Sequence, residues 1–212
     1  VKKPLSKNAN LLSMPFILHI TSTSMFILQD SGRAVKPVAK REEKGYTDRT
    51  YRKGGRFMKI LVLSDSHGNV ANMIRAVERE APRVIFHLGD CWRDGERLHD
   101  RFPEIPFEQV PGNCDFRSHE AAERLSYLEG KRILLCHGHT YGVKQSLLAA
   151  GYAAEEKDLD IFLFGHTHRP LVDLRGKTLF LNPGSIGDYA RPFYGLLTIA
   201  NGMADARTVA LD

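Results

Sequence analysis

Short apolar runs alternate with helix-like stretches from residue 58 onward. The first run, at 59–64, is rich in aliphatic residues and too short for most helices, so it predicts a buried strand. A helix-like stretch follows from 69 to about 80. The alternation continues with apolar runs at 84–88, 107–110, 133–136 and 161–164, and with helix-like stretches at 95–101 and 143–157. Strands alternating with helices are typical of an α/β fold.

The pattern changes after residue 168. Helix-like stretches stop, and the strand-like segments that follow are 171–174, 178–181, 194–200 and 204–210. Consecutive strands with short connections favour antiparallel pairing. Residues 58–212 therefore predict either one mixed sheet or two packed sheets.

The first 57 residues differ in composition from the rest. They hold 12 Lys and Arg against 4 Asp and Glu, whereas 58–212 hold 18 against 21, so the net charge of +5 originates in this segment. The apolar stretch 11–28 is interrupted by Pro15 and His19 and keeps no period of 2 or 3.6. We expect residues 1–57 to be a basic extension that is disordered or not native, and 58–212 to be the functional domain.

The codons of residues 53–58 support a start at Met58. Lys53-Gly54-Gly55 can be encoded as AAA GGA GGN, which resembles a bacterial ribosome-binding site at a normal distance from an ATG at Met58. Residues 1–57 would then be a translated upstream region. Two alternatives stay open: a secretory signal, although no small-x-small cleavage site follows the apolar stretch directly, and a basic arm that binds nucleic acid or anionic lipid.

Composition excludes some classes of protein. No run of about 18 apolar residues occurs, so we expect no membrane-spanning helix and no membrane partner. The 3 cysteines are an odd number and do not describe a secreted disulfide framework, which favours a cytoplasmic protein.

Nearly every predicted strand ends in residues that commonly bind metal ions. The clusters are Asp65-Ser66-His67, Gly89-Asp90, Gly112-Asn113-Cys114-Asp115, His137-Gly138-His139 and Gly165-His166-Thr167-His168. The carboxyl ends of strands are where ligands bind in open α/β sheets. In an extended segment the spacing of Asp-x-His and His-x-His directs both side chains to one side. Mixed Asp, Asn and His donors suit borderline divalent ions.

Single residues of these types have simpler explanations. One histidine after a strand is more often a hydrogen-bonded residue than a ligand, whereas five such clusters are hard to explain without a shared site. His87 lies within a strand and is expected to be a core histidine with satisfied hydrogen bonds, while His99 and His119 lie in polar, helix-like surroundings and should be solvated. Cys136 should be buried, and Cys114 could face the cleft.

Taken in order, the clusters resemble the calcineurin-like metallophosphoesterase family over essentially all of residues 58–212. Its D-x-H, G-D, G-N-x-[DE], H-G-H and G-H-x-H blocks all occur. Asn182-Pro183-Gly184-Ser185 and the Arg191 that follows resemble the closing loop of the small bacterial and archaeal phosphodiesterase branch. The resemblance implies an α/β fold of two packed mixed β-sheets flanked by helices, a four-layer αββα sandwich.

The resemblance also implies a dinuclear metal site. One ion would be bound by Asp65, His67 and His168, and the other by Asn113, His137 and His166. Asp90 would bridge them, since a carboxylate can share its two oxygens between cations ~3.5–4 Å apart. The expected cofactors are two divalent ions, manganese first, with Fe, Co, Ni or Zn as alternatives. A hydroxide bridging these ions would attack the phosphorus of a phosphoester.

Three residues are candidates for substrate contact. Asn113 can orient a phosphoryl oxygen through its amide, and His139 could contact the substrate or protonate the leaving group. Cys114 stands where much of the family has a histidine that is thought to act as general acid. The resemblance therefore favours phosphodiesters with good leaving groups over general phosphomonoesters. The expected partner is a small-molecule phosphoester, because the acidic balance of 58–212 argues against nucleic acid.

The competing hypothesis is a catalytically weak scaffold of the same fold, as in a retromer subunit that acts through protein contacts. Missing ligands would favour that hypothesis, and none of the seven is missing. The sequence leaves the oligomeric state open, a homo-oligomer included.

Overall fold

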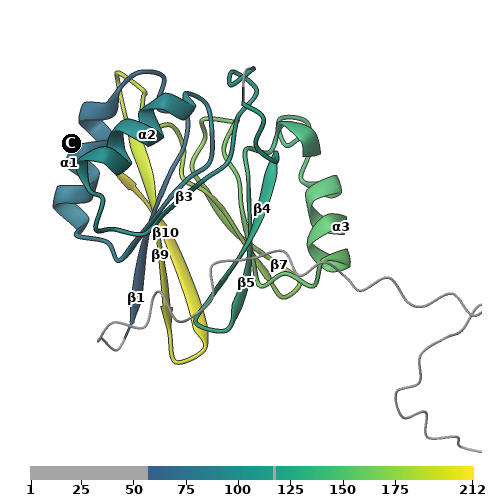
Figure 1. Cartoon of the computed structure of the whole chain (residues 1–212). Coiled ribbons are helices and arrows are strands. Elements are labelled where there is room, and N and C mark those ends of the chain that lie inside the picture. Colours follow the sequence, from purple (N-terminus) through teal and green to yellow (C-terminus); the bar gives the residue numbers. More distant parts are fainter. Residues whose placement is uncertain (1–56, 117) are drawn as a thin grey trace, which may run out of the picture. The chain divides into compact units, whose positions relative to one another are not determined.

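The computed structural model describes residues 57–116 and 118–212 (Figure 1). The prediction of a separate N-terminal extension at 1–57 falls almost entirely outside this range and stays a prediction. The described residues form two five-stranded mixed sheets with helices on their outer faces, as expected from the sequence.

The first sheet combines parallel pairing among three strands with antiparallel pairing at one edge. Its order is β10-β9-β1-β2-β3. β1, β2 and β3 run parallel, and β9 and β10 add an antiparallel edge. The bounds are Met58–Leu63 for β1, Val84–His87 for β2, Phe107–Gln109 for β3, Phe193–Ala200 for β9 and Met203–Ala210 for β10.

The second sheet has the order β4-β5-β6-β8-β7. β5, β6 and β8 run parallel in its centre, while β4 and β7 flank them in the antiparallel sense. The bounds are Glu123–Leu128 for β4, Lys131–Cys136 for β5, Ile161–Leu163 for β6, Leu171–Arg175 for β7 and Thr178–Asn182 for β8.

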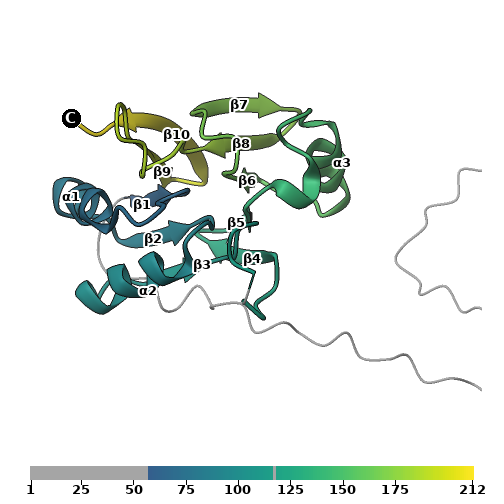
Figure 2. The same cartoon turned by 90° about the horizontal axis from the view of Figure 1, so that it is seen from above.

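Three apolar clusters hold the layers together. The inner faces of the two sheets pack on each other through residues such as Val62, Phe86 and Leu135. Helices α1 (Val70–Glu80) and α2 (Trp92–Arg101) cover the outer face of the first sheet, and α3 (Leu148–Glu156) covers the second. Figure 2 shows the resulting order of helix, sheet, sheet, helix.

The structure differs from the sequence prediction in three places. The helix expected at 95–101 begins three residues earlier, at Trp92, and the one expected at 143–157 begins only at Leu148, after a 3₁₀ turn at His139–Tyr141. Strand β4 was not predicted, because its half-polar sequence gives no apolar run. Among the described residues no helix combines the length and apolar character needed to cross a membrane.

Candidate metal centre

The loops that follow β1, β2, β3, β5 and β6 meet at one end of the two sheets. Backbone hydrogen bonds link them: Asp65 N donates to Gly89 O at 3.0 Å, and Gly165 N donates to His137 O at 3.0 Å. The His166 amide donates to Asp65 Oδ2 at 3.1 Å, which ties a loop of the second sheet to a loop of the first. The predicted strand-end residues therefore converge at the junction of the two sheets.

Several of the candidate ligands have a left-handed backbone rather than the extended one assumed from the sequence. The φ angles are 54° at Asp65, 45° at His67, 59° at Asp90, 67° at His166 and 58° at His168. Non-glycine residues in this region cost about 1–3 kcal/mol each and are concentrated at functional sites. The i, i+2 argument was therefore wrong in its premise, because sharp loop geometry, and not strand alternation, directs these side chains.

Asp65, His67 and His168 form one candidate group of ligands. The Nε2 atoms of the two histidines are 3.3 Å apart. Asp65 Oδ1 lies 3.1 Å from His168 Nε2 and 4.0 Å from His67 Nε2. This oxygen is buried, and no contact around it has the geometry of a hydrogen bond. Three atoms that can donate electron pairs thus point at a common position.

Asp65, Asp90 and His137 form a second candidate group. His137 Nε2 lies 3.5 Å from Asp90 Oδ1 and 3.9 Å from Asp65 Oδ1. Asn113 joins this group, since its Oδ1 is 3.1 Å from the same His137 nitrogen. Within the described residues, Asp65 belongs to both groups and Asp90 to one. The sequence-based assignment of Asp90 as the bridging carboxylate thus has Asp65 as an alternative.

His166 and His139 stand beside this second group. Their ring centroids lie 5.0 Å and 5.5 Å, respectively, from that of His137. His139 Nδ1 is buried without a hydrogen-bond partner. His137 is oriented from the other side, because its Nδ1 is 2.8 Å from the Leu88 carbonyl oxygen. That contact leaves Nε2 of His137 facing Asn113 and the carboxylates.

Burial and neighbouring charges shift the pKa values in the centre. Burial by itself would raise the pKa of Asp65, but His168 and His137 hold it below its usual value. The carboxylate of Asp65 in turn raises the pKa of His168. Burial, together with His137 and Lys144, lowers the pKa of His166 to about 4. His166 is therefore neutral at pH 7 and has a lone pair for a metal ion.

Sequence reasoning missed the hydroxyl groups that orient the ligands. Ser64 Oγ donates to Asp65 Oδ2 at 2.6 Å, and Ser185 Oγ donates to the Asp65 carbonyl oxygen at 2.8 Å. Asn182 Nδ2 donates to Gly165 O at 2.8 Å, which fixes the loop that carries His166. Ser185 and Asn182 belong to a motif visible in the sequence, whereas Ser64 has no sequence signal.

Cys114 is exposed beside Asn113, and its contact with substrate stays a prediction. Its backbone N–H donates to Asp90 Oδ1 at 2.9 Å. Partial burial and the adjacent Asp90 raise the pKa of its thiol to about 11, so the thiol is protonated at neutral pH and is a weak acid. Asp115 fixes the loop, because its carboxylate accepts hydrogen bonds from the amides of Gly112 and Trp92, both at 2.8 Å.

The residues set aside as structural are buried or exposed as expected, with one correction. Cys136 is buried, and His99 and His119 are exposed. His87 is fully buried in β2, but neither ring nitrogen has a hydrogen-bond partner, so the prediction of a satisfied core histidine is wrong. Strand alternation places it on the face that helices α1 and α2 cover, because its parallel partner Leu63 packs in the apolar cluster beneath them. Burial lowers the pKa of His87 to about 4.

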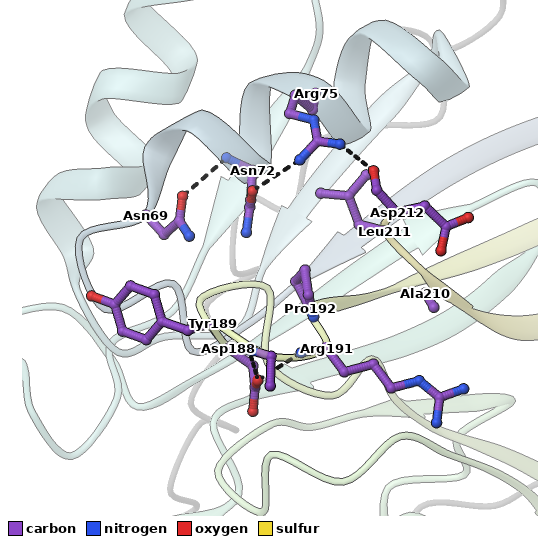
Figure 3. A pocket seen from close by; sticks show the side chains of 11 residues that line it. Asn69, Asn72, Arg75, Asp188, Tyr189, Arg191, Pro192, Ala210, Leu211 and Asp212 are labelled. Atoms are coloured by element: carbon purple, nitrogen blue, oxygen red, sulfur yellow. Dashed lines mark hydrogen bonds between the residues drawn. The ribbon is translucent and has the colours of Figure 1, made fainter.

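A cavity of about 460 Å³ lies next to the loops of the centre, although none of the candidate ligands lines it. Asn69, two residues after His67, lines it, and so does Asp188, whose carboxylate interacts electrostatically with His168. Next to Asp188, the Gly187 Cα approaches the metal-site loop so closely that a Cβ would lie 2.3 Å from the Ser66 carbonyl oxygen. Figure 3 shows the wall formed by Asn69, which caps α1, and by Asn72 and Arg75 on α1; the loop with Asp188, Tyr189 and Arg191 faces it.

The donor set fits divalent cations. Asp65 Oδ1 is buried without a hydrogen-bond donor in good geometry, although an unsatisfied buried carboxylate oxygen is costly. Imidazole nitrogens with carboxylate and amide oxygens are suitable ligands for borderline divalent ions, whereas no thiolate is among them. The fold and these residues together define a two-sheet α/β protein with a candidate metal centre at the junction of its sheets.

Comparison with known proteins identifies the family. Residues 58–202 match the calcineurin-like phosphoesterase superfamily domain. The chain is 38% identical over 157 residues to "Probable metallophosphoesterase YsnB" of Bacillus subtilis, covering 71% of this chain and 89% of that protein. It is 28% identical over 153 residues to the phosphodiesterase YfcE of Escherichia coli K12, covering 61% and 79%. The chain belongs to the calcineurin-like phosphoesterase superfamily.

A solved structure supports the same conclusion at the level of the fold. A Streptococcus pneumoniae protein described as a predicted phosphoesterase superposes with a TM-score of 0.63 at 29% sequence identity. The superposition covers 74% of this chain and 91% of that one. The expectation of a calcineurin-like phosphoesterase fold is therefore confirmed.

Proposed function

We propose that this chain is a phosphodiesterase that depends on two divalent metal ions bound where its two sheets meet. The observation that carries the proposal is Asp65 Oδ1, a buried oxygen with the Nε2 atoms of three histidines, His67, His137 and His168, within 4.0 Å. Protonation of the histidines alone does not explain why they cluster, since each protonated ring would place a positive charge next to the other rings and repel them. Cations at the two candidate groups would account for it.

Seven side chains would hold the ions. One set consists of Asp65, His67 and His168. The other consists of Asn113, His137 and His166. The two sets share one carboxylate, either Asp90 or Asp65. Divalent ions bound there would lower the pKa of a water molecule and offset negative charge on the phosphoryl oxygens. Manganese is our first choice, and the donor set also suits Fe, Co, Ni and Zn.

The chain's own residues have separate tasks around the phosphoester. Asn113 Nδ2 is 3.5 Å from the weakly accepting Cys114 sulfur, so its amide hydrogens are available to a phosphoryl oxygen. His139, whose buried Nδ1 has no hydrogen-bond partner, would contact the ester or hold a proton for the leaving oxygen. The Cys114 thiol would contact the substrate without supplying a proton.

Two observations support a diester over a monoester. The cavity lined by Asn69, two residues after His67, and by Asp188 would offer space for the second ester group, which a monoester lacks. A thiol stands at position 114 instead of an acid, which suits leaving groups that depart as stable anions. The relative YfcE, at 28% identity, is named as a phosphodiesterase.

Activity after metal removal tests the proposal. We expect the chelator-treated chain to be inactive, and added Mn²⁺ to restore hydrolysis of bis-p-nitrophenyl phosphate more than that of p-nitrophenyl phosphate. Asp65→Asn should abolish this recovery. Asp160→Asn is the matched control, because Asp160 also accepts a backbone hydrogen bond, from Arg132 N at 2.9 Å, but in the second sheet away from the centre. Full activity of the chelated chain or of Asp65→Asn would contradict the proposal.

The scaffold alternative predicts a different result. A scaffold would bind metal ions with the same ligands yet hydrolyse neither ester with any of the five metals. Absence of hydrolysis in samples whose bound metal has been measured would favour the scaffold, whereas hydrolysis by the metal-loaded chain would favour the enzyme.

A further inference from the structure

We propose that Asp94 is a positioning residue that holds the loop carrying His67 in the conformation needed to bind a metal ion. The proposal rests on the metal centre described above. Asp94 belongs to the first turn of α2 and lies outside both candidate ligand groups. It therefore acts on the site through the loop and not as a ligand.

The Asp94 carboxylate bonds to the residues on both sides of His67. Its Oδ2 accepts a hydrogen bond from Ser66 Oγ at 2.8 Å and another from the Gly68 amide at 2.7 Å. Asp94 is 3% exposed, so water competes little for these bonds. One buried oxygen thus bridges the two positions that determine the direction of His67.

His67 needs such support, because its own side chain is poorly packed. The side chain of His67 is 37% exposed, in contrast to those of Asp65 and His137, which are fully buried. Its backbone has the strained φ of 45°. The position of its Nε2 atom is therefore set mainly by the backbone of residues 66–68, which Asp94 holds.

The surroundings of Asp94 suit an anchoring carboxylate. It lies in the first turn of α2, where unpaired N–H groups and the helix dipole favour negative charge. Its other oxygen, Oδ1, is 3.8 Å from the exposed Arg97 guanidinium. Because both loop bonds go to Oδ2, an asparagine with its carbonyl oxygen at that position can keep both.

Metal affinity tests the proposal independently of catalysis. Chelator-treated full-length chain is titrated with Mn²⁺ by calorimetry, and the melting temperature is measured for each variant. Asp94→Ala should weaken binding of one ion by about 10–100-fold, the range found when groups that hold metal ligands are removed, and leave the other ion unchanged. Asp94→Asn should bind within a few-fold of the wild type. Ser66→Ala removes one of the two Asp94 bonds, together with the 3.3 Å contact between Ser66 Oγ and the Asp90 carbonyl oxygen, and should fall between.

The control variant is Asp160→Ala, which removes a carboxylate that accepts a backbone N–H bond far from the centre. It should lower the melting temperature without weakening Mn²⁺ binding. Wild-type affinity in Asp94→Ala overturns the proposal, and so does equal loss of affinity in Asp94→Asn or in Asp160→Ala. If Asp94→Ala does not fold, unchanged affinity in Ser66→Ala overturns it. A wild-type chain that binds no Mn²⁺ would instead overturn the metal centre itself.

Discussion

The unpartnered His87 gives a quantitative prediction about stability and pH. Its two ring nitrogens are buried without hydrogen bonds, and an unsatisfied buried polar group costs about 1–3 kcal/mol. We expect His87→Leu, which removes both nitrogens and keeps an apolar side chain of similar size, to be more stable than the wild type at pH 7.5 by about that amount.

The difference should grow in acid. The pKa of His87 is about 4 in the folded chain against 6.5 in the unfolded chain, so only the unfolded chain takes up this proton between pH 6.5 and pH 4. The free energy of unfolding that is present above pH 6.5 therefore decreases as the pH falls from 6.5 toward 4. The loss is on the order of 2 kcal/mol at pH 5 and about 3 kcal/mol well below pH 4. His87→Leu should not show this component.

Urea unfolding at pH 7.5, 6 and 5, with a chelator present so that metal release does not contribute, measures both effects. His119→Gln is the control, because His119 is exposed and the substitution should leave the pH dependence close to that of the wild type. The reasoning fails if His87→Leu is less stable than the wild type at pH 7.5. It also fails if the difference between the two proteins is the same at pH 5 as at pH 7.5.

Four further predictions concern the site and the domain. If Asp90 bridges the ions, Asp90→Asn should cost several kcal/mol of transition-state stabilisation, measured as kcat/KM in samples whose bound metal is also determined. If Asp65 is the shared carboxylate instead, Asp65→Asn should lose more bound metal than Asp90→Asn. Hydrolysis should slow steeply as leaving groups become more basic, since the Cys114 thiol is a weak acid. Cys114→His should speed hydrolysis only for poor leaving groups, by at most 10²–10⁴-fold. A shallow dependence of the wild-type rate on leaving-group pKa would contradict this. Gly112→Ala should impair metal binding and turnover, because its Cβ would lie 2.1 Å from Asp90 Oδ1, whereas Gly151→Ala, with no heavy atom within 4 Å of its Cβ and no positive φ, is the control for adding a methyl group at a glycine; equal effects of the two would refute the steric argument. Residues 58–212 alone should fold and match the turnover of the full chain, and an insoluble or inactive short form would refute the proposal that 1–57 is dispensable.

The local pattern of the sequence was sufficient to place most elements of the fold. Aliphatic runs such as 59–64 and 161–164 correspond to β1 and β6 within a residue or so, because a strand buried on both faces must be apolar along its whole length. β4 could not be found this way. Its Ser126 is buried only because the hydroxyl bonds to Glu108 Oε1 of β3 at 2.9 Å, a partner 18 positions away.

The sequence by itself determined which residues are candidates for the chemistry, because donors placed directly after buried strands must gather where those strands end. Only the tertiary structure decided how they are arranged. Contacts between segments far apart in the chain set three features of the site. These are the left-handed backbone of Asp65 and His67, the position of Asp65 in both ligand groups and the bonds of Asp94 across the loop. The unpartnered nitrogens of His87 arise in the same way, because hydrogen-bond partners are set by packing and not by neighbours in sequence.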